Sequence, residues 1–309
     1  MPAVFSAADL ANHGGIFHRL RLDGKLCPAR LSVFGDPVAH SASPPMHNAA
    51  LRACGHNLQY VRIRVTPEEL SQALGNLGEA GFLGTNLTIP HKQAALDFID
   101  EVSPEARLMG AINTVAVRSG RLHGFNTDGP GFAAAVKEEF GAELGTRRVL
   151  ILGGGGGAGR AISVQCALEG SPEIFIANRT LEKAEILSEE IEESLGVNIT
   201  PISLAAESLK NAVDCVDLIV NATPLGMTVN DPSPLNNGLL ARRHFVYDTV
   251  YGAGTSALIR QAEAAGAQCA NGLSMLLHQG ALAYEIWFNE AAPLEIMREA
   301  LKTAISKKS

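Results

Sequence analysis

The stretch V-L-I-L-G-G-G-G-G-A-G-R, Val149 to Arg160, decides the fold of the second half of this chain. Four apolar residues stop at a glycine tract and an alanine-rich segment follows, which predicts a buried parallel strand, a tight turn and the start of a helix. Gly154, Gly156 and Gly159 have the G-x-G-x-x-G spacing. In that motif the first glycine permits the turn, the second lets the backbone approach a pyrophosphate, and the third lets the helix pack on the strand. The pattern favours a dinucleotide site over a glycine-rich loop that only turns a corner.

A second signal comes from the next predicted strand, Ile174 to Ala177, which ends in Asn178-Arg179-Thr180. Roughly 20 residues after the glycines, an NAD site needs Asp or Glu to bind the ribose 2′-hydroxyl. Here the side chains are neutral or cationic, and Lys183 lies one helical turn further on. These groups suit a 2′-phosphate, so the sequence favours NADP over NAD.

The composition limits the classes of protein to which the chain can belong. Its 309 residues are enough for two domains, and 46% hydrophobic content is ordinary for a soluble α/β protein. A formal net charge of -7 argues against nucleic-acid binding, because no basic face can dominate. No apolar run reaches membrane-spanning length, and Asp9 interrupts any signal-like segment at the N-terminus. We therefore expect a cytoplasmic protein with neither a nucleic-acid nor a membrane partner.

Cysteine and histidine spacing gives no sign of a metal site. The five cysteines are scattered without a C-x-x-C pair, which favours a reducing compartment over a disulfide framework. The nine histidines are dispersed, and His40 and His47 are the closest notable pair. We expect no bound metal.

The first half alternates predicted strands and helices, after a lead-in over residues 1–28 that we expect to be weakly ordered or helical. The predicted strands are Leu31–Gly35, Gln59–Val65, Thr85–Ile89 and Gly110–Val117, with an antiparallel return over Leu122–Phe125. The predicted helices begin at about Pro44, run from Pro67 to Ala80, and run from Pro90 to Ala106 or Leu108.

Several polar residues of this half have both a structural and a chemical interpretation. Ser41 and Ser43 lie in the loop before the Pro44 helix, where capping by Ser43 is the locally favoured interpretation and binding of a polar small molecule is the alternative. Lys92 lies in the first turn of a helix, where the dipole disfavours a cation; it is either a surface lysine or one that faces an anion or transfers a proton. Asp128 either caps the next helix or serves a site where the first domain meets the second.

Polar segments also follow the later strands. Leu218–Val220 ends in N-A-T-P-L-G-M, and Phe245–Tyr247 ends in D-T-V-Y-G. Polar residues at the carboxyl ends of parallel strands line the ligand crevice of such sheets. A helix is predicted over Thr255–Ala265, and Asn271–Ala281 begins a long amphipathic helix that carries Gln279.

Taken together, these motifs resemble those of the shikimate dehydrogenase family. The matching segments run from about Leu31 to about Trp287: H-S-A-S-P, N-L-T-I-P-H-K, G-A-I-N-T, N-T-D-G, the glycine loop, N-R-T, N-A-T-P-L-G-M and G-L-S-M-L-L-H-Q. The resemblance implies an NADP-dependent oxidoreductase that reversibly reduces 3-dehydroshikimate to shikimate in aromatic amino-acid (chorismate) biosynthesis. It also implies an α/β protein of two domains with a cleft between them, commonly closing on ligand. The substrate domain would be 1–127, completed by the C-terminal helix 273–309, and the Rossmann-type doubly wound NADP domain would be 128–272.

The resemblance assigns a role to each matching position. The substrate carboxylate would be bound by Ser41, Ser43 and Tyr251. The ring hydroxyls would meet Asn86, Thr88, Lys92, Asn113, Asp128 and Gln279. Lys92 and Asp128 would form the catalytic pair, so the resemblance favours binding over capping at Ser43 and Asp128. The cofactor would contact Gly154, Gly155, Gly156, Gly157, Ala158, Asn178, Arg179, Thr180, Lys183, Thr223 and Gly272. The glycine tract departs from the family pattern because Gly153 extends it and Gly159 replaces a larger residue, so its register stays open.

Two rival functions are also open. One is a quinate/shikimate dehydrogenase that uses NAD or NADP, against which Arg179 argues, since such relatives usually replace that basic residue. The other is a non-catalytic NADP-binding regulator, which should have lost Lys92 or Asp128. The sequence does not decide whether the chain forms a homodimer.

Overall fold

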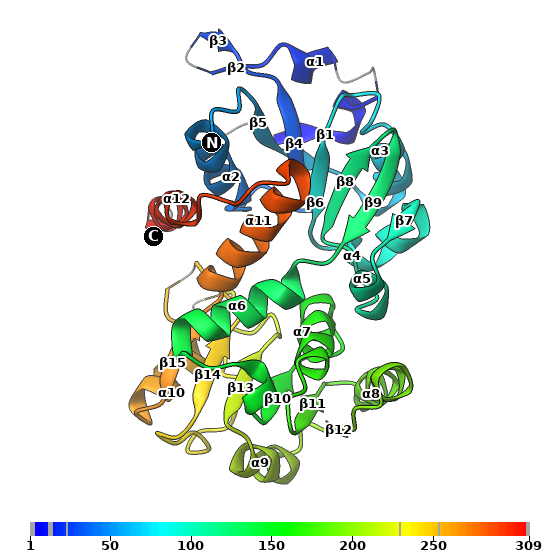
Figure 1. Ribbon diagram of the computed structural model, residues 1–309. Helices are drawn as coiled ribbons and strands as arrows, with labels where there is room; N and C mark the ends of the chain where they lie inside the picture. Colours follow the sequence, from blue (N-terminus) through cyan, green and yellow to red (C-terminus); the bar gives the residue numbers. More distant parts are fainter. Residues whose placement is uncertain (1–3, 12–14, 23, 229, 253, 307–309) are drawn as a thin grey trace. The chain divides into compact units, whose positions relative to one another are not determined.

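The computed structural model describes residues 4–11, 15–22, 24–228, 230–252 and 254–306 (Figure 1). Contacts between residues divide the chain into two compact units. The first unit holds the chain up to Thr127 and again from Gln279 to the end of the last helix, and the second unit holds Asp128–His278. The mixed α/β fold class predicted from the sequence is confirmed.

A seven-stranded sheet forms the centre of the first unit, in the order β1-β5-β4-β6-β8-β9-β7. Its strands are β1 Val4–Ser6, β4 Ala29–Gly35, β5 Gln59–Arg64, β6 Gly84–Leu87, β7 Glu101–Val102, β8 Thr114–Arg118 and β9 Arg121–Phe125. All neighbours are parallel except that β8 runs antiparallel to both β6 and β9. The carboxyl ends of β4 and β6 therefore lie side by side. The antiparallel return expected over Leu122–Phe125 corresponds to the β8–β9 pair.

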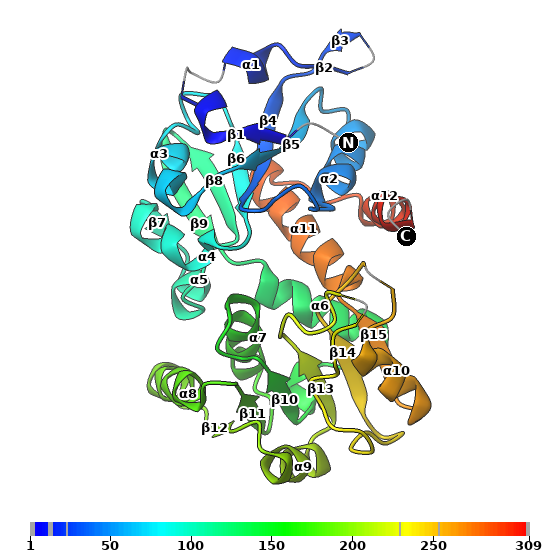
Figure 2. The same cartoon turned by 180° about the vertical axis from the view of Figure 1, so that it is seen from behind.

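Helices and a small hairpin complete the first unit. They are α1 Gly15–His18, α2 Ser43–Ala53, α3 Leu70–Gly75, α4 His91–Ala94, α5 Pro104–Leu108 and α12 Leu294–Ser306, with 3-10 turns at Ala7–Asp9, Pro67–Glu69 and Ala95–Phe98 and the hairpin β2 Arg21–Leu22 with β3 Lys25–Leu26. The last helix, α12, packs along α2, and the two helices are neighbours in both views (Figures 1 and 2).

Two expectations for the first unit are wrong. The described part of residues 1–28 is more than a loose or helical lead-in, because β1 pairs in parallel with β5 and the side chains of Leu10 and Phe17 are buried in the core. The long helix expected from Pro90 to Leu108 is broken into short turns with β7 between them. Ser103 accepts a hydrogen bond from the backbone N–H of Ala106 at 3.2 Å and so starts a separate helix.

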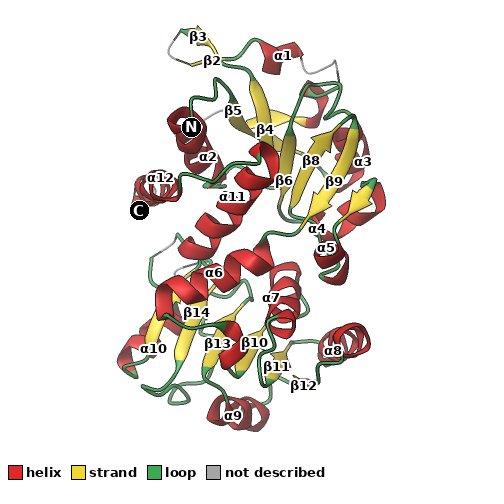
Figure 3. Cartoon of the chain, viewed as in Figure 1, coloured by secondary structure: helices red, strands yellow, loops and turns green. Residues whose placement is uncertain are grey.

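The second unit is built on six parallel strands in the order β12-β11-β10-β13-β14-β15, which is the doubly wound dinucleotide-binding arrangement. The strands are β10 Val149–Leu152, β11 Ile174–Ala177, β12 Ile199–Ile202, β13 Leu218–Asn221, β14 Phe245–Asp248 and β15 Gln268–Asn271. The helices of this unit are α6 Asp128–Phe140, α7 Gly157–Leu168, α8 Leu181–Leu195, α9 Ala206–Cys215 and α10 Ala257–Ala264 (Figure 3). Helix α11 Leu273–Phe288 begins in this unit and belongs to the first unit from Gln279 onward. All four residues of β10 are fully buried, as expected of a central parallel strand.

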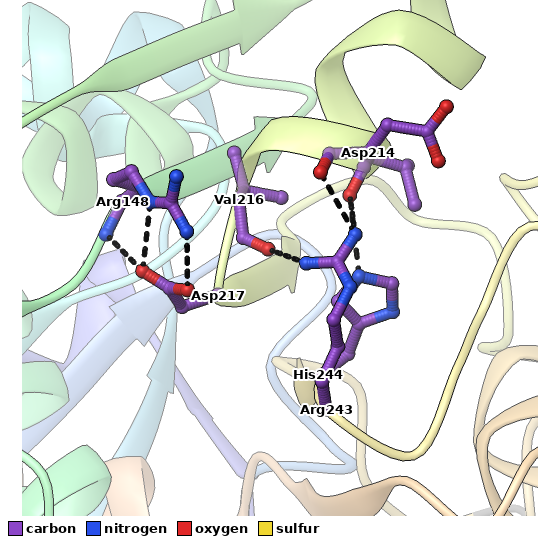
Figure 4. Close-up of polar contacts among 7 residues, drawn as sticks. Arg148, Asp214, Val216, Asp217, Arg243 and His244 are labelled. Carbon is purple, nitrogen blue, oxygen red and sulfur yellow. Dashed lines mark hydrogen bonds and ion pairs between the residues drawn. The ribbon is translucent and has the colours of Figure 1, made fainter.

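Polar side chains hold the amino ends of these strands (Figure 4). Arg148, just before β10, pairs with Asp217, just before β13, through Nη2 to Oδ1 at 2.9 Å and Nε to Oδ2 at 3.1 Å. This pairing lowers the pKa of the Asp217 carboxyl. Arg243 donates to the carbonyls of Val213, Asp214 and Val216 at the end of α9. These bonds link the segments at the amino ends of the strands, whereas the glycine tract lies in a loop at the carboxyl ends.

Candidate active site

The turn after β10 depends on three glycines for different steric reasons. Gly153 has a φ of +85°, a left-handed conformation that favours glycine. A Cβ at Gly154 would lie 2.4 Å from Cγ2 of Ile176, and one at Gly159 would lie 2.3 Å from the carbonyl oxygen of Gly153. The sharp turn therefore occurs at Gly153, and its assignment to Gly154 is wrong, because Gly154 is needed for close packing against β11.

Packing restricts the next glycines less severely. A Cβ at Gly157 would meet no atom within 4 Å, whereas one at Gly155 would lie 3.1 Å from Cβ of Lys183 and 3.3 Å from Cγ of Asn178. The glycine turn, Asn178 and Lys183 therefore border one small region at the start of α7. Arg179 and Lys183 are exposed, and within the described ranges neither forms an ion pair. Bare backbone beside two available cations suits a phosphorylated ligand.

A buried network supports the loop that follows β13. The hydroxyl of Thr223 donates to Oδ1 of Asn221 at 2.6 Å, and the amide of Asn221 donates to Oδ1 of Asp248 at 2.9 Å. Ser256 donates to the other Asp248 oxygen at 2.5 Å. Burial raises the pKa of the Asp248 carboxyl. Thr223 is thereby held against the glycine turn, since a Cβ at Gly153 would lie 2.8 Å from its Cγ2.

The loops after β14 and β15 also touch each other. A Cβ at Gly272 would lie 2.0 Å from the carbonyl oxygen of Thr249, so only glycine fits there. Tyr251 lies two residues further along the β14 loop. Ala158 is the second residue of α7, and Thr180 immediately precedes α8. All the residues predicted to bind cofactor therefore belong to the second unit.

In the first unit, a chain of buried hydrogen bonds joins three of the predicted substrate residues. The hydroxyl of Tyr60 donates to Oδ1 of Asn86 at 2.7 Å, and the Asn86 amide donates to the carbonyl of Asn113 at 3.1 Å. The Asn113 amide donates to Oγ1 of Thr127 at 2.9 Å and, more weakly, to Oε1 of Gln279 at 3.4 Å. The Asn86 amide also donates to Thr114, so only its oxygen retains capacity for a ligand.

The two serines lie at the start of α2, beside the loop that follows β6. Helix α2 begins at Ser43 itself, its N-cap position is Ala42, and no side chain caps it. Capping by Ser43 is therefore wrong; Oγ of Ser41 accepts a bond from the Ser43 N–H at 3.3 Å. The two loops are in contact, because a Cβ at Gly35 would lie 2.5 Å from Cγ2 of Thr88.

Lys92 and Asp128 belong to different units. Lys92 is half-buried in the short helix α4, and its carbonyl accepts the N–H of Ile112 at 2.7 Å. Asp128 is 5% exposed and is the first residue of α6. Its neighbour Thr127 donates its N–H to Oδ1 of Asn113 at 2.8 Å, which anchors the backbone just before the carboxylate.

Sequence reasoning missed three residues of this region: Tyr60, Thr127 and His47. The His47 ring stacks on Tyr60 with centroids 4.4 Å apart and an interplanar angle of 8°. It is fully buried, and neither ring nitrogen has a hydrogen-bond partner among the described residues. Burial lowers its pKa to about 3, so the ring is neutral. Only the strand alternation around Tyr60 could have indicated an inward-facing hydroxyl.

The described part of the chain holds neither a metal-binding cluster nor a membrane-spanning helix. Among these residues no group of three or more His, Cys, Asp or Glu side chains could hold a metal ion. No helix of the same part combines the length and apolar character that crossing a membrane requires.

Comparisons with known proteins match nearly the whole chain. Family models match residues 33–115 (shikimate dehydrogenase substrate binding domain), 134–244 (shikimate / quinate 5-dehydrogenase) and 272–302 (shikimate 5'-dehydrogenase C-terminal domain). A shikimate dehydrogenase (NADP(+)) of Methanopyrus kandleri is 43% identical over 88% of this chain and 94% of its own. The shikimate 5-dehydrogenase of Thermus thermophilus, solved with NADP(H) and shikimate, has a TM-score of 0.79 at 40% identity and covers 89% and 99% of the two chains. A quinate dehydrogenase of Corynebacterium glutamicum, solved with NAD, has a TM-score of 0.78 at 29% identity, covering 88% and 98%.

Proposed function

Because the chain belongs to the shikimate dehydrogenase family, we propose that it catalyses the reversible, NADPH-dependent reduction of 3-dehydroshikimate to shikimate. This is a step of aromatic amino-acid biosynthesis. The observation that carries the proposal is the buried amide network of Asn86, Asn113 and Gln279, whose Asn113 follows Ile112, the residue that donates its N–H to the carbonyl of the half-buried Lys92. Such a network suits a small, hydroxyl-rich substrate, because it presents fixed polar groups rather than an apolar surface.

The residues of the second unit fit NADP(H). The pyrophosphate would bind the backbone of Gly154–Ala158, where the start of α7 and its exposed N–H groups favour an anion. Arg179 and Lys183 would bind the 2′-phosphate, with Asn178 and Thr180 beside them. Thr223 and Gly272 would lie nearer the ribose and nicotinamide. The bound nucleotide supplies a hydride.

The first unit would bind most of the substrate. Ser41 and Ser43 would bind the carboxylate, with Tyr251 contributed by the second unit. The ring hydroxyls would contact Asn86, Thr88, Lys92, Asn113, Asp128 and Gln279. Since both amide hydrogens of Asn86 are already used, we propose that Asn86 accepts a hydrogen bond from the substrate and does not donate one.

Reduction of the 3-keto group places negative charge on its oxygen. Protonated Lys92 would stabilise that charge and deliver the proton, and Asp128 would hold the ammonium and a neighbouring hydroxyl in position. The anchoring of Thr127 to Asn113 supports this role, because it limits the positions open to the Asp128 carboxylate. The presence of both residues argues against a non-catalytic regulator.

One steady-state comparison tests the proposal. Oxidation of shikimate with NADP⁺ is measured against oxidation of quinate with NAD⁺, and kcat/KM should be far higher for the first pair. Higher kcat/KM for quinate with NAD⁺ would favour the quinate/shikimate dehydrogenase instead. Arg179→Ala should raise the KM for NADPH far more than that for NADH; equal effects would mean that the phosphate binds elsewhere. A cytoplasmic location and a homodimer stay predictions.

A further inference from the structure

A cavity of about 520 Å³ lies between α2 and α12 in the first unit. Arg52 and Arg62 line it from one side, and Glu299 and Thr303 of α12 line it from the other. None of the residues proposed to bind substrate or cofactor lines it. The cavity is therefore a separate feature of the first unit.

Arg62 is a buried cation that has no anionic partner among the residues that the structure describes. The residue is only 4% exposed, and its one hydrogen bond among the described residues runs from Nη2 to the carbonyl oxygen of Ser41, at 2.5 Å. Its Nε is buried and has no partner there. An arginine remains charged in proteins, and a buried charge without a counter-ion is costly. Burial accordingly lowers the pKa of this guanidinium.

The other charges that face the cavity leave it positive. Arg52 is exposed and forms no ion pair with any residue in the described ranges. Glu299 pairs with Lys302, from Nζ to Oε1 at 3.3 Å, so its charge is offset on its own helix. Pro44 and Pro45 also line the cavity and bring no backbone N–H. The cationic donors available to a ligand here are therefore the two guanidinium groups, and the Asn48 amide lines the same cavity.

We propose that this cavity binds a small oxyanion, a phosphate or carboxylate group, on Arg62 and Arg52. A guanidinium binds such groups through two parallel hydrogen bonds, and the Nη1 amine of Arg62, unlike the enclosed Nε, is neither fully buried nor hydrogen-bonded to any described residue. The volume admits a small metabolite that carries the anion.

The site would be coupled to the α2 loop, because the guanidinium that binds the oxyanion also holds the carbonyl of Ser41. An anion that reorients Arg62 would change the position of the Ser41 hydroxyl. The consequence is a changed KM for shikimate. This consequence rests on the proposed function, whereas the oxyanion site itself does not.

Isothermal titration of the full chain with inorganic phosphate tests the site, with sodium chloride of equal ionic strength as the blank. Wild type should bind phosphate, and Arg62→Gln should weaken that binding about ten- to hundredfold, the range for hydrogen bonds to a charged group. Arg179→Ala should retain the Arg62-dependent binding. Undiminished binding by Arg62→Gln overturns the proposal. A parallel titration with succinate shows whether a carboxylate or a phosphate is preferred.

A second pair of variants guards against misfolding of Arg62→Gln. Thr303 is exposed on α12, so Thr303→Asp places a carboxylate in the cavity without disturbing the core, and Thr303→Asn is its neutral match. Thr303→Asp should abolish the Arg62-dependent phosphate binding, whereas Thr303→Asn should retain it; equal Arg62-dependent binding by the two contradicts the proposal. Of these two variants, only Thr303→Asn should show a KM for shikimate, measured at saturating NADP⁺, that changes when phosphate is added. A KM that ignores phosphate in both variants refutes the coupling, while the titrations still decide the site.

Discussion

Replacement of His47 by leucine should remove part of the loss of unfolding free energy that the first unit shows at acidic pH. The imidazole is fully buried and packs against Tyr60 and Trp287, with ring centroids 4.4 and 5.4 Å away, and its nitrogens have no partner among the described residues. Leucine loses the ring stacking, worth about 0.5–1.5 kcal/mol. It also removes two unpartnered polar atoms, each of which costs about 1–3 kcal/mol. His47→Leu should therefore be at least as stable as wild type at pH 7.5.

The pH dependence has a definite sign. Burial lowers the pKa of His47 to about 3 in the folded state, from its ordinary value of 6.5. Between these two values the unfolded chain binds a proton that the folded chain does not, so the free energy of unfolding falls as the pH falls. With about 1.36 kcal/mol per pH unit, wild type should lose about 2 kcal/mol between pH 7.5 and 5.0 through this residue. His47→Leu should lack that loss.

Urea unfolding at the two pH values measures the effect. Trp287 is the only tryptophan of the chain and belongs to the first unit, so its fluorescence reports on the region concerned. His244→Leu is the contrast: both of its ring nitrogens are hydrogen-bonded, so this change should destabilise the second unit already at pH 7.5, which circular dichroism follows. If wild type and His47→Leu lose the same unfolding free energy on acidification, the reasoning fails.

The other predictions concern the network, the proton donor and the glycine turn. Tyr60→Phe leaves the Asn86 oxygen without its 2.7 Å donor, which should cost about 1–3 kcal/mol in urea unfolding and raise the KM for shikimate. Ser32→Ala removes a buried hydroxyl bond on the opposite face of the sheet and should leave that KM unchanged; the same KM rise in both would contradict a specific role. Lys92→Ala should retain NADPH binding by fluorescence titration but lose ~10²–10⁴-fold in kcat, and turnover within a few-fold of wild type would exclude Lys92 as the proton donor. Gly159→Ala places a Cβ 2.3 Å from a carbonyl oxygen and should lower the stability, measured by thermal unfolding, by about 1–3 kcal/mol. An unchanged Tm would show that the backbone of the turn shifts to accommodate the added methyl group.

Local patterns were sufficient for the parts of the fold that rest on neighbours in sequence. The apolar run of β10 and the glycines after it predict a strand, turn and helix, because consecutive residues alone specify the burial of both faces and the absence of Cβ atoms. Even in this segment, the position of the turn within the glycine tract depended on tertiary contacts. Which glycine turns the chain followed from the packing of Gly154 against Ile176, a residue of another strand.

The sequence by itself determined the α/β class, the parallel sheet at the glycine tract and the residue types available for a polar site. Only the tertiary structure decided which of these residues meet. Tyr60 lies 26 positions from Asn86, and Gln279 lies 166 positions from Asn113. Hydrophobic periodicity reports which face of an element is buried, but a hydrogen-bond partner is set by strand order and register, which depend on the whole packed sheet.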